Sequence, residues 1–288
     1  MQRTGVFVAN MKKLIYFSLL TLICAISIVA CNDDSKDVTD NPDLVAGKGI
    51  LSLKFDNVSG NQDLKLDSTK YTNSSGEDFT VSTLNYFISN IKLVRDDGKT
   101  YTIPQDSSYF LVRESDPASQ IITLKQLPEG NYTGIEYIIG VDSLRSVSGI
   151  DKRVGALDPS GDPEDGGMYW AWSSGYIFLK LEGISSKAES ANNKYYYHIG
   201  FFGGYDSKTV NNIKTVKLDF AGNKAVVESG NVPQIRLVGD VQKVFNGPVP
   251  ISIAKNPSIM FDFTGSSNAA NNYKSMFSFG EITQYRFL

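Results

Sequence analysis

Short segments rich in β-branched and aromatic residues recur along most of this chain, with turn signals between them. Turn sequences such as "RDDGKT", "LPEGNY" and "FAGNKA" separate them, and the chain's 15 tyrosines and 16 phenylalanines suit pleated sheets better than helices. This pattern predicts an all-β fold, an immunoglobulin-like two-sheet antiparallel β-sandwich. A short helix is expected near residues 268–277, where Tyr273, Met276 and Phe277 recur at helical spacing. The predicted strands are "GILSLKF", "NYFISNIKLV", "TYTIP", "SYFLVR", "IITL", "GIEYIIGV", "GYIFLKLEG", "KYYYHIGFF", "IKTVKLDF", "QIRLVGDVQKVF" and "SIMFDF".

The N-terminal segment has the features of an export signal. The start is either Met1 or Met11, and Met11 is followed by Lys12, Lys13 and the apolar run 14–30. The last four residues of "LIYFSLLTLICAISIVAC" resemble a bacterial lipoprotein box, in which Cys31 becomes the lipidated N-terminus. We therefore expect a signal peptide over 1–30, an acidic tether over 31–48 and one β-sandwich domain over 49–288. The alternative is an uncleaved anchor, because the apolar run is nearly long enough to span a bilayer.

Cleavage and lipidation would leave the mature chain without a free thiol or a disulfide. Cys24 lies in the predicted signal and Cys31 would carry lipid, so a large core must hold the domain together. Removal of residues 1–30 takes away three basic side chains and no acidic one, leaving 25 basic against 31 acidic. Without a basic patch, nucleic acid is not expected as a partner. The tether "CNDDSKD" resembles those of outer-membrane lipoproteins exposed on the surface of Bacteroidetes-type bacteria, and a periplasm-facing location is the alternative.

Both tryptophans follow the longest irregular stretch, residues 143–167. A loop of this length in a compact sandwich is usually functional or mobile. In an extended strand, Met168, Trp170 and Trp172 would share one face and form an aromatic patch. The patch would lie either inside the sandwich or at its mouth.

Several motifs occur in the order seen in one family. The chain resembles the MbnP-like proteins, exported β-sandwich proteins associated with copper acquisition, from about Leu51 to Phe263. In copper-binding relatives the site is built from histidine imidazoles and a tryptophan oxidised to kynurenine, often by a dihaem peroxidase-like partner enzyme. The motifs are "LNYFISNIKL" (84–93), "IGVDS" (139–143), "GALDP" (155–159), "MYWAWSSGYIFLKLEG" (168–183) and "YHIGFFGG" (197–204).

The resemblance implies copper binding by His198 and by Trp170 or Trp172. An intact indole offers no lone pair to a metal, whereas the aniline nitrogen of kynurenine does. Copper usually takes two or three imidazole or thioether donors, and this chain has a single histidine. Met168 is a candidate for the missing donor. Asn57 lies in a first-strand region where the resemblance implies a histidine in some relatives.

Other readings of the same residues compete with the copper site. A lone histidine among tyrosines is often a hydrogen-bonded rim residue, and paired tryptophans and a methionine are often core packing. Asp142 is expected to accept N–H bonds from the loop that follows it. The acidic side chains of the long loop could hold calcium, but their spacing lacks a calcium-loop pattern and favours a solvated loop. These acids are Asp158, Asp162, Glu164 and Asp165.

Catalysis is not expected. The mature chain would have no Cys/His pair, and no "GxSxG" elbow accompanies His198. Two functional hypotheses remain. The first is a lipid-anchored copper-binding protein of the cell envelope. The second is a surface β-sandwich that has lost the metal site and binds a glycan, a peptide or a partner protein through its aromatic residues or its long loop.

Overall fold

The computed structural model describes residues 47–160, 167–170 and 175–287. Most of these residues form strands, and two sheets pack face to face as an all-β sandwich, which confirms the predicted fold class. The predicted signal peptide, tether and Cys31 lie outside the described residues.

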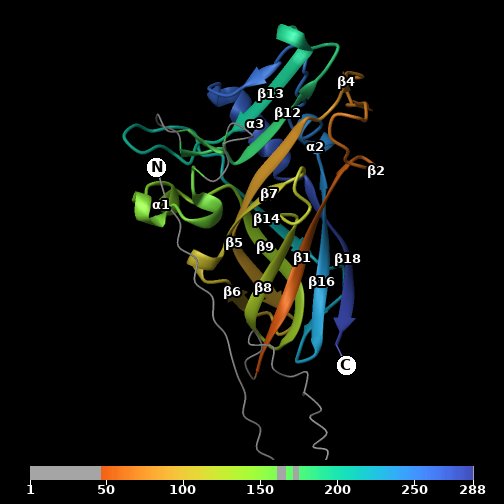
Figure 1. The fold of residues 1–288 in the computed structure, drawn as a ribbon, viewed down its shortest axis with the longest axis vertical. Helices are drawn as coiled ribbons and strands as arrows, with labels where there is room; N and C mark the ends of the chain where they lie inside the picture. Colours follow the sequence, from red (N-terminus) through yellow and green to blue (C-terminus); the bar gives the residue numbers. More distant parts are fainter. Residues whose placement is uncertain (1–46, 161–166, 171–174, 288) are drawn as a thin grey trace, which may run out of the picture. The chain divides into compact units, whose positions relative to one another are not determined.

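The smaller sheet has five strands in the order β18-β16-β1-β2, with β8 also paired to β1. Figure 1 shows β1, β16 and β18 side by side. β1 and β16 run parallel, so the sandwich is not wholly antiparallel. The strands of this sheet are β1 (Lys48–Ser59), β2 (Gln62–Asp63), β8 (Ile121–Pro128), β16 (Asn231–Asp240) and β18 (Phe277–Arg286).

The larger sheet has nine strands, with the central order β14-β9-β5-β12-β13-β17. β15 also pairs with β9, and β6 and β7 pair with β5. Its strands are β5 (Thr83–Arg95), β6 (Thr100–Thr102), β7 (Tyr109–Arg113), β9 (Gly130–Ile139), β12 (Leu179–Ile184), β13 (Lys194–Ile199), β14 (Lys214–Asp219), β15 (Ala225–Val227) and β17 (Ser258–Ile259).

The remaining elements are short, apart from one helix. Two small hairpins are formed by β3 with β4 and by β10 with β11. Their bounds are β3 (Tyr71–Thr72), β4 (Asp78–Phe79), β10 (Tyr169–Trp170) and β11 (Gly175–Tyr176). The helices are α1 (Ser143–Ser146), α2 (Gln242–Phe245), α3 (Phe263–Tyr273) and the 3-10 helices η1 (Gln105–Ser107), η2 (Ile150–Lys152), η3 (Gly155–Leu157) and η4 (Ala191–Asn193).

The main core fills the space between the two sheets. Phe55 of β1 is fully buried, and its ring contacts Tyr86 of β5 and Tyr137 of β9 edge to face, with centroids 6.1 and 5.9 Å apart. Alternation along the strands sends every second side chain into this core, as the sequence period of two requires. The main core therefore joins both sheets through aromatic contacts.

A second apolar cluster lies on the other face of the larger sheet. Phe87 alternates along β5 with Tyr86 and Ile88, which belong to the main core, and so points the opposite way. Residues before, within and after the β10-β11 hairpin contribute to it. The buried members of this second cluster are Phe87, Leu111, Val141, Leu157, Met168, Trp170, Tyr176, Ile177, Phe178, Phe201 and Phe202.

Three sequence expectations about element bounds are wrong. The segment 234–245 is not one strand, because β16 ends at Asp240, whose Oδ1 accepts the N–H of Gln242 at 3.0 Å and turns the chain into α2. Only the start of "SIMFDF" is a strand. The helix expected over 268–277 begins earlier, where the side chain of Asp262 caps it by accepting the N–H of Thr264 at 3.0 Å. Phe277 instead begins β18.

Candidate functional site

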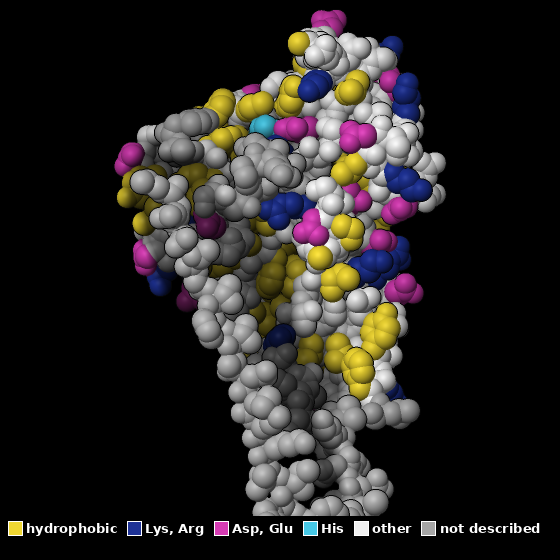
Figure 2. Space-filling view, viewed as in Figure 1, with side chains coloured by type: hydrophobic (Ala, Val, Ile, Leu, Met, Phe, Trp, Pro, Cys, Tyr) yellow, Lys and Arg dark blue, Asp and Glu magenta, His cyan; other side chains and the backbone are white. Residues whose placement is uncertain are grey.

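His198 points away from the main core. Along β13, Tyr195, Tyr197 and Ile199 are buried in that core, whereas Tyr196 and His198 alternate with them on the opposite face. The side chain of His198 is 14% exposed. In Figure 2 this histidine, the one in the chain, is the cyan side chain at the surface. The imidazole is therefore accessible on the face that carries the second cluster.

Glu182 of β12 holds the imidazole. Its Oε1 lies 2.5 Å from Nε2 of His198. Burial raises the pKa of Glu182, but the hydrogen bond to His198 and the positive charge of Lys180 outweigh burial, so the pKa is below its usual value. An ionised carboxylate only accepts hydrogen bonds, so Nε2 carries the proton between them. In a neutral imidazole this arrangement leaves Nδ1 with its lone pair.

Lys180 brings a buried cation to the same place. Its side chain is 4% exposed, and Nζ lies 3.9 Å from Oε1 of Glu182. In the sheet register Lys180 stands directly opposite His198 on one side and Asn85 on the other. The carboxylate of Glu182 is thus shared by an imidazole and an ammonium group.

Trp170 lies on the same face of the sheet as His198. Gly200 is two residues beyond His198, so both positions point to one face where the backbone is extended. A Cβ placed on Gly200 would lie only 2.9 Å from Cζ3 of the indole. The indole also contacts Phe201 and Phe261, with centroids 5.6 and 5.3 Å away. The indole edge of Trp170 therefore packs against Gly200, two residues from His198 along the chain.

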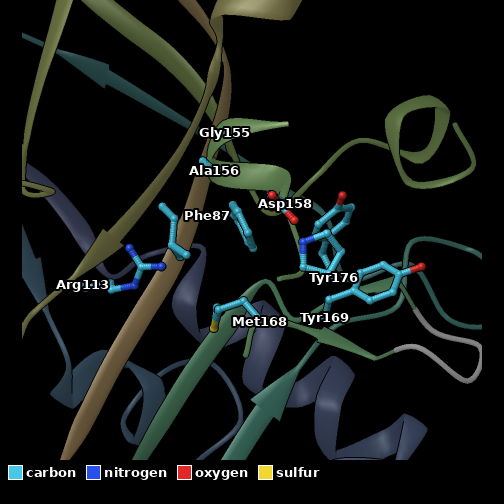
Figure 3. A pocket seen from close by; sticks show the side chains of 10 residues that line it. Phe87, Arg113, Gly155, Ala156, Asp158, Met168, Tyr169 and Tyr176 are labelled. Atoms are coloured by element: carbon cyan, nitrogen blue, oxygen red, sulfur yellow. The ribbon is translucent and has the colours of Figure 1, made fainter. Parts of the chain in front are cut away.

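Met168 lies deeper in the second cluster. It shares burial with Trp170 two residues on, as the extended geometry predicts, and it lines a cavity of about 250 Å³. Figure 3 shows this cavity, with Arg113 at one side and Asp158, Tyr169 and Tyr176 at the other. His198 is not among the residues that line this cavity.

The other candidate residues named from the sequence either lie outside the described residues or are buried elsewhere in the fold. Trp172, Asp162, Glu164 and Asp165 lie outside the described residues. Asn57 is buried in β1, where Nδ2 donates to Glu114 at 2.9 Å and Oδ1 accepts from the hydroxyl of Tyr86 at 2.9 Å. These bonds place Asn57 in a polar seam of the smaller sheet and not beside His198.

The acidic loop shows no calcium geometry in its described part. Asp158 Oδ1 accepts the backbone N–H and the hydroxyl of Ser160, at 2.9 and 2.7 Å, as in an ordinary turn. Across the described ranges, no group of three or more His, Cys, Asp or Glu side chains could hold a metal ion.

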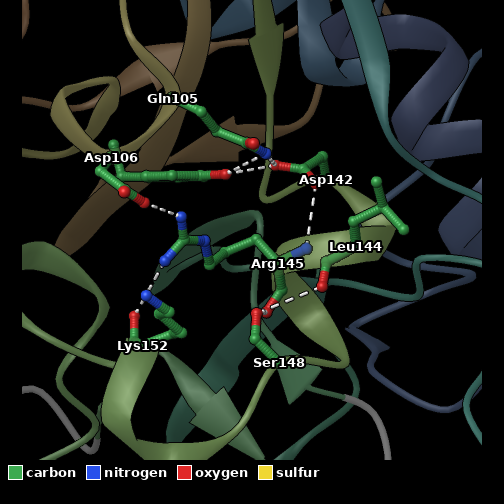
Figure 4. A network of polar contacts seen from close by, with 8 residues as sticks. Gln105, Asp106, Asp142, Leu144, Arg145, Ser148 and Lys152 are labelled. Atoms are coloured by element: carbon green, nitrogen blue, oxygen red, sulfur yellow. Dashed lines mark hydrogen bonds and ion pairs between the residues drawn. The ribbon is translucent and has the colours of Figure 1, made fainter.

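Asp142 has the structural role expected from the sequence. Its Oδ1 caps α1 by accepting the N–H of Arg145 at 3.0 Å, and its Oδ2 accepts the hydroxyl of Tyr109 at 2.5 Å. Arg145 extends this network, because its guanidinium pairs with Asp106, donates to the carbonyl of Lys152 and lies over the Tyr109 ring at 4.8 Å (Figure 4). We call this network the Arg145 clamp; it fastens the long loop to the β6-β7 segment.

Glu182, Lys180 and the Arg145 clamp were not singled out from the sequence. A signal for Glu182 exists, because Lys180 and Glu182 alternate with Leu179 and Leu181 in "FLKLEG" and must face away from the core. Which strand stands opposite them is not encoded locally. The pairing of Glu182 with His198 could therefore be identified only from the fold.

Comparison with known proteins gives the family. A family model described as MbnP matches residues 48–261. No curated protein matches the chain. Among solved structures, MbnP from Methylosinus trichosporium is similar at 16% identity, with a TM-score of 0.48, over 72% of this chain and 80% of that one. In the part of the chain that the structure describes, no helix has the length and apolar character to cross a membrane. Because this family model matches most of the chain, the protein belongs to the MbnP family.

Proposed function

We propose that this protein binds copper at the face of the larger sheet that carries His198 and Trp170. The observation that carries the proposal is that the indole edge of Trp170 packs against Gly200, two residues from His198, whose imidazole points away from the main core. Family membership supports the same reading, as the resemblance of the motifs implied.

The donors on this face suit copper in part. His198 would supply a nitrogen, and Glu182 orients it as carboxylates commonly orient metal-binding histidines. An oxidised Trp170 would supply an aniline nitrogen. Nitrogen and oxygen donors are typical of copper(II) sites. The second imidazole of the relatives is absent from this chain, which has one histidine.

Conversion of tryptophan to kynurenine has a defined balance. Dioxygen, or two equivalents of hydrogen peroxide with loss of two waters, supplies the two oxygen atoms that cleave the indole C2–C3 bond, and hydrolysis then releases C2 as formate. The product is heavier than tryptophan by about 4 Da and bears a free aromatic amine. The oxidant would be delivered by a dihaem peroxidase-like enzyme of the same compartment.

The proposal is tested by metal analysis of the mature domain purified from its native envelope. Copper content should fall to background in His198→Ala and fall partly in Glu182→Gln. Tyr196→Phe is the matched control, because Tyr196 lies on the same face, 6.3 Å from the imidazole between ring centroids, and is not a proposed donor. Equal copper in wild type and His198→Ala would exclude the imidazole as a ligand.

Peptide mass spectrometry tests the modified residue separately. Trypsin releases residues 154–180 as one peptide, because no Lys or Arg lies between Arg153 and Lys180. Fragment ions would assign the gain of about 4 Da to Trp170 or Trp172 and distinguish it from oxidation of Met168, which adds a single oxygen. Unmodified tryptophans in copper-loaded protein would contradict the kynurenine ligand but would not contradict His198 as a ligand.

We also propose attachment to the outer membrane through a lipid on Cys31, with the domain facing the cell surface. Support comes from the lipoprotein box and the acidic tether in the sequence. Wild-type protein should partition into detergent and be degraded when protease is added to intact cells. Cys31→Ala should lose the lipid and leave the detergent phase. Protection from protease in intact cells would favour a periplasm-facing location.

A further inference from the structure

A second hollow, separate from the cavity beside Met168, lies next to the tryptophan hairpin. Its volume is about 550 Å³, within the usual range for ligand pockets. Its walls are the loop 146–153, the β10-β11 hairpin and the loop 202–209. We call it the loop groove.

The walls of the loop groove are held by specific contacts. The hydroxyl of Ser143 donates to the carbonyl of Phe202 at 2.8 Å, which joins the first wall to the third. The Arg145 clamp also holds the first wall, because the guanidinium of Arg145 donates to the carbonyl of Lys152 (Figure 4). In the third wall, Gly204 has a positive φ of 95°, and a Cβ there would lie 1.8 Å from the carbonyl oxygen of Ser207. This tight turn fixes the direction of Tyr205.

Aromatic rings line the loop groove from floor to rim. Trp170 and Phe202 are buried at its base, and Tyr205 stands at its rim with 68% of its surface exposed. Tyr169 forms part of the wall, and the guanidinium of Arg153 lies 4.8 Å above the centre of its ring. A large exposed tyrosine on a rigid turn is a ready contact surface for a ligand.

Two polar side chains of the loop groove are not used by the protein itself. Within the described residues, the side chains of Asp206 and Ser207 make no hydrogen bond or ion pair. The guanidinium of Arg153 lies over the Tyr169 ring and acts electrostatically on Tyr176. Asp206 offers an acceptor, Arg153 offers donors, and Ser207 offers both. One negative and one positive side chain leave the groove without an excess of either charge.

We propose that the loop groove binds a neutral carbohydrate. A pyranose ring presents an apolar face of axial C–H bonds, which would pack on Tyr205, and a rim of hydroxyl groups that both donate and accept. Those hydroxyls match the combination of Asp206, Ser207 and Arg153. An anionic ligand would meet Asp206 and a cationic one would meet Arg153, so the balanced charges favour an uncharged sugar.

The test uses the whole mature domain and four probes: maltohexaose, cellohexaose, xylohexaose and mannohexaose. Isothermal titration calorimetry should detect at least one of them with a dissociation constant in the millimolar range or below. Tyr205→Ala and Asp206→Ala should each weaken that binding at least tenfold. Tyr285→Ala is the matched control, because Tyr285 is also an exposed tyrosine but lies on β18 of the smaller sheet, and it should bind as wild type does.

Two results would overturn the proposal. One is the absence of binding by all four oligosaccharides at millimolar concentration. The other is binding that Tyr205→Ala does not weaken. A peptide or protein that binds in a Tyr205-dependent manner while the sugars do not would reassign the groove to that partner. The copper content of Tyr205→Ala should equal that of wild type, so this test is independent of the proposed metal site.

Discussion

The two apolar clusters on opposite faces of the larger sheet are built in different ways. The main core is formed by alternating side chains of paired strands from both sheets, and its aromatic rings contact one another across the sandwich. The second cluster takes Phe87 and Leu111 from strands of the larger sheet and Trp170 and Tyr176 from the small β10-β11 hairpin, and its other members lie outside the strands. The proposed functional residues belong to the second face. Paired strands therefore build the larger core, and less regular segments complete the smaller one.

The largest expected effect comes from the main core. Phe55→Ala removes a fully buried ring that contacts Tyr86, Tyr137 and Phe277. The free energy of unfolding in urea should fall by about 3–5 kcal/mol. Phe287→Ala, at an exposed position, should change it by less than about 0.5 kcal/mol. Similar losses in the two variants would mean that the main core is not the principal source of stability.

A substitution in the second cluster should loosen that region and leave the main core intact. Met168→Ala deletes a buried side chain and should cost about 2 kcal/mol, whereas Met168→Leu should cost less than about 1.5 kcal/mol because volume is retained. Amide hydrogen exchange should accelerate over 168–178 while β5 stays protected. Uniform acceleration in both regions would show that the two clusters unfold together. Loss of copper from Met168→Leu would identify the sulfur as a ligand.

The Arg145 clamp should matter less for stability than for the order of the long loop. Asp142→Ala removes the cap of α1 and the acceptor for the Tyr109 hydroxyl. We expect a loss of about 1 kcal/mol and faster tryptic cleavage after Lys152 and Arg153. The variant Asp96→Ala serves as control, because this carboxylate pairs with Lys224 outside that loop. Unchanged cleavage would show that Asp142 does not hold the loop.

The smallest effect concerns the polar seam in the smaller sheet, and it depends on pH. Burial raises the pKa of Glu114 to about 7, with Asp63 and Asp56 adding to the rise and Asn57 opposing it. Because the folded-state pKa lies above the unfolded value, the folded protein binds the proton more tightly. Stability from this group is greatest below about pH 4.5 and is lost as the pH rises through 7.

Glu114→Gln should remove that dependence. At pH 8 the variant should melt about 2 °C higher than wild type, and at pH 4.5 the two should melt together. Thermal unfolding followed by circular dichroism at the two pH values measures the difference. An equal change in melting temperature at both pH values would assign the effect to packing and not to protonation of Glu114.

Most of the main core could be predicted from the sequence, because its strands carry a period of two that depends on nearest neighbours alone. Residues 194–199 are an example, since their buried side chains alternate as the pattern requires. Residues 84–89 of β5 are instead buried on both faces, because the main core covers one face and the second cluster the other. The C-terminal strand β18 was missed, and α3 was placed too late, because "FDFTGSSNAANNY" has weak apolar periodicity and its Asp262 cap was not recognised.

The candidate site was predictable only in part. His198 and Trp170 could be named from motifs, and their common face follows from the strand that ends near Gly200. The partner Glu182 could not be named, because β12 and β13 meet through a register that depends on the whole sheet. The loop groove was equally hidden, since its three walls come from loops that have no periodic signal.

Gly200 has a consequence beyond its place two residues from His198. Its missing side chain is the space into which the edge of Trp170 fits, with the carbonyl oxygen of Tyr176 crowding the same point at 2.7 Å. A methyl group added at Gly200 would push the Trp170 ring away from the sheet while leaving every donor atom in the chain. The residue without a side chain thus sets how closely the indole of Trp170 approaches the sheet.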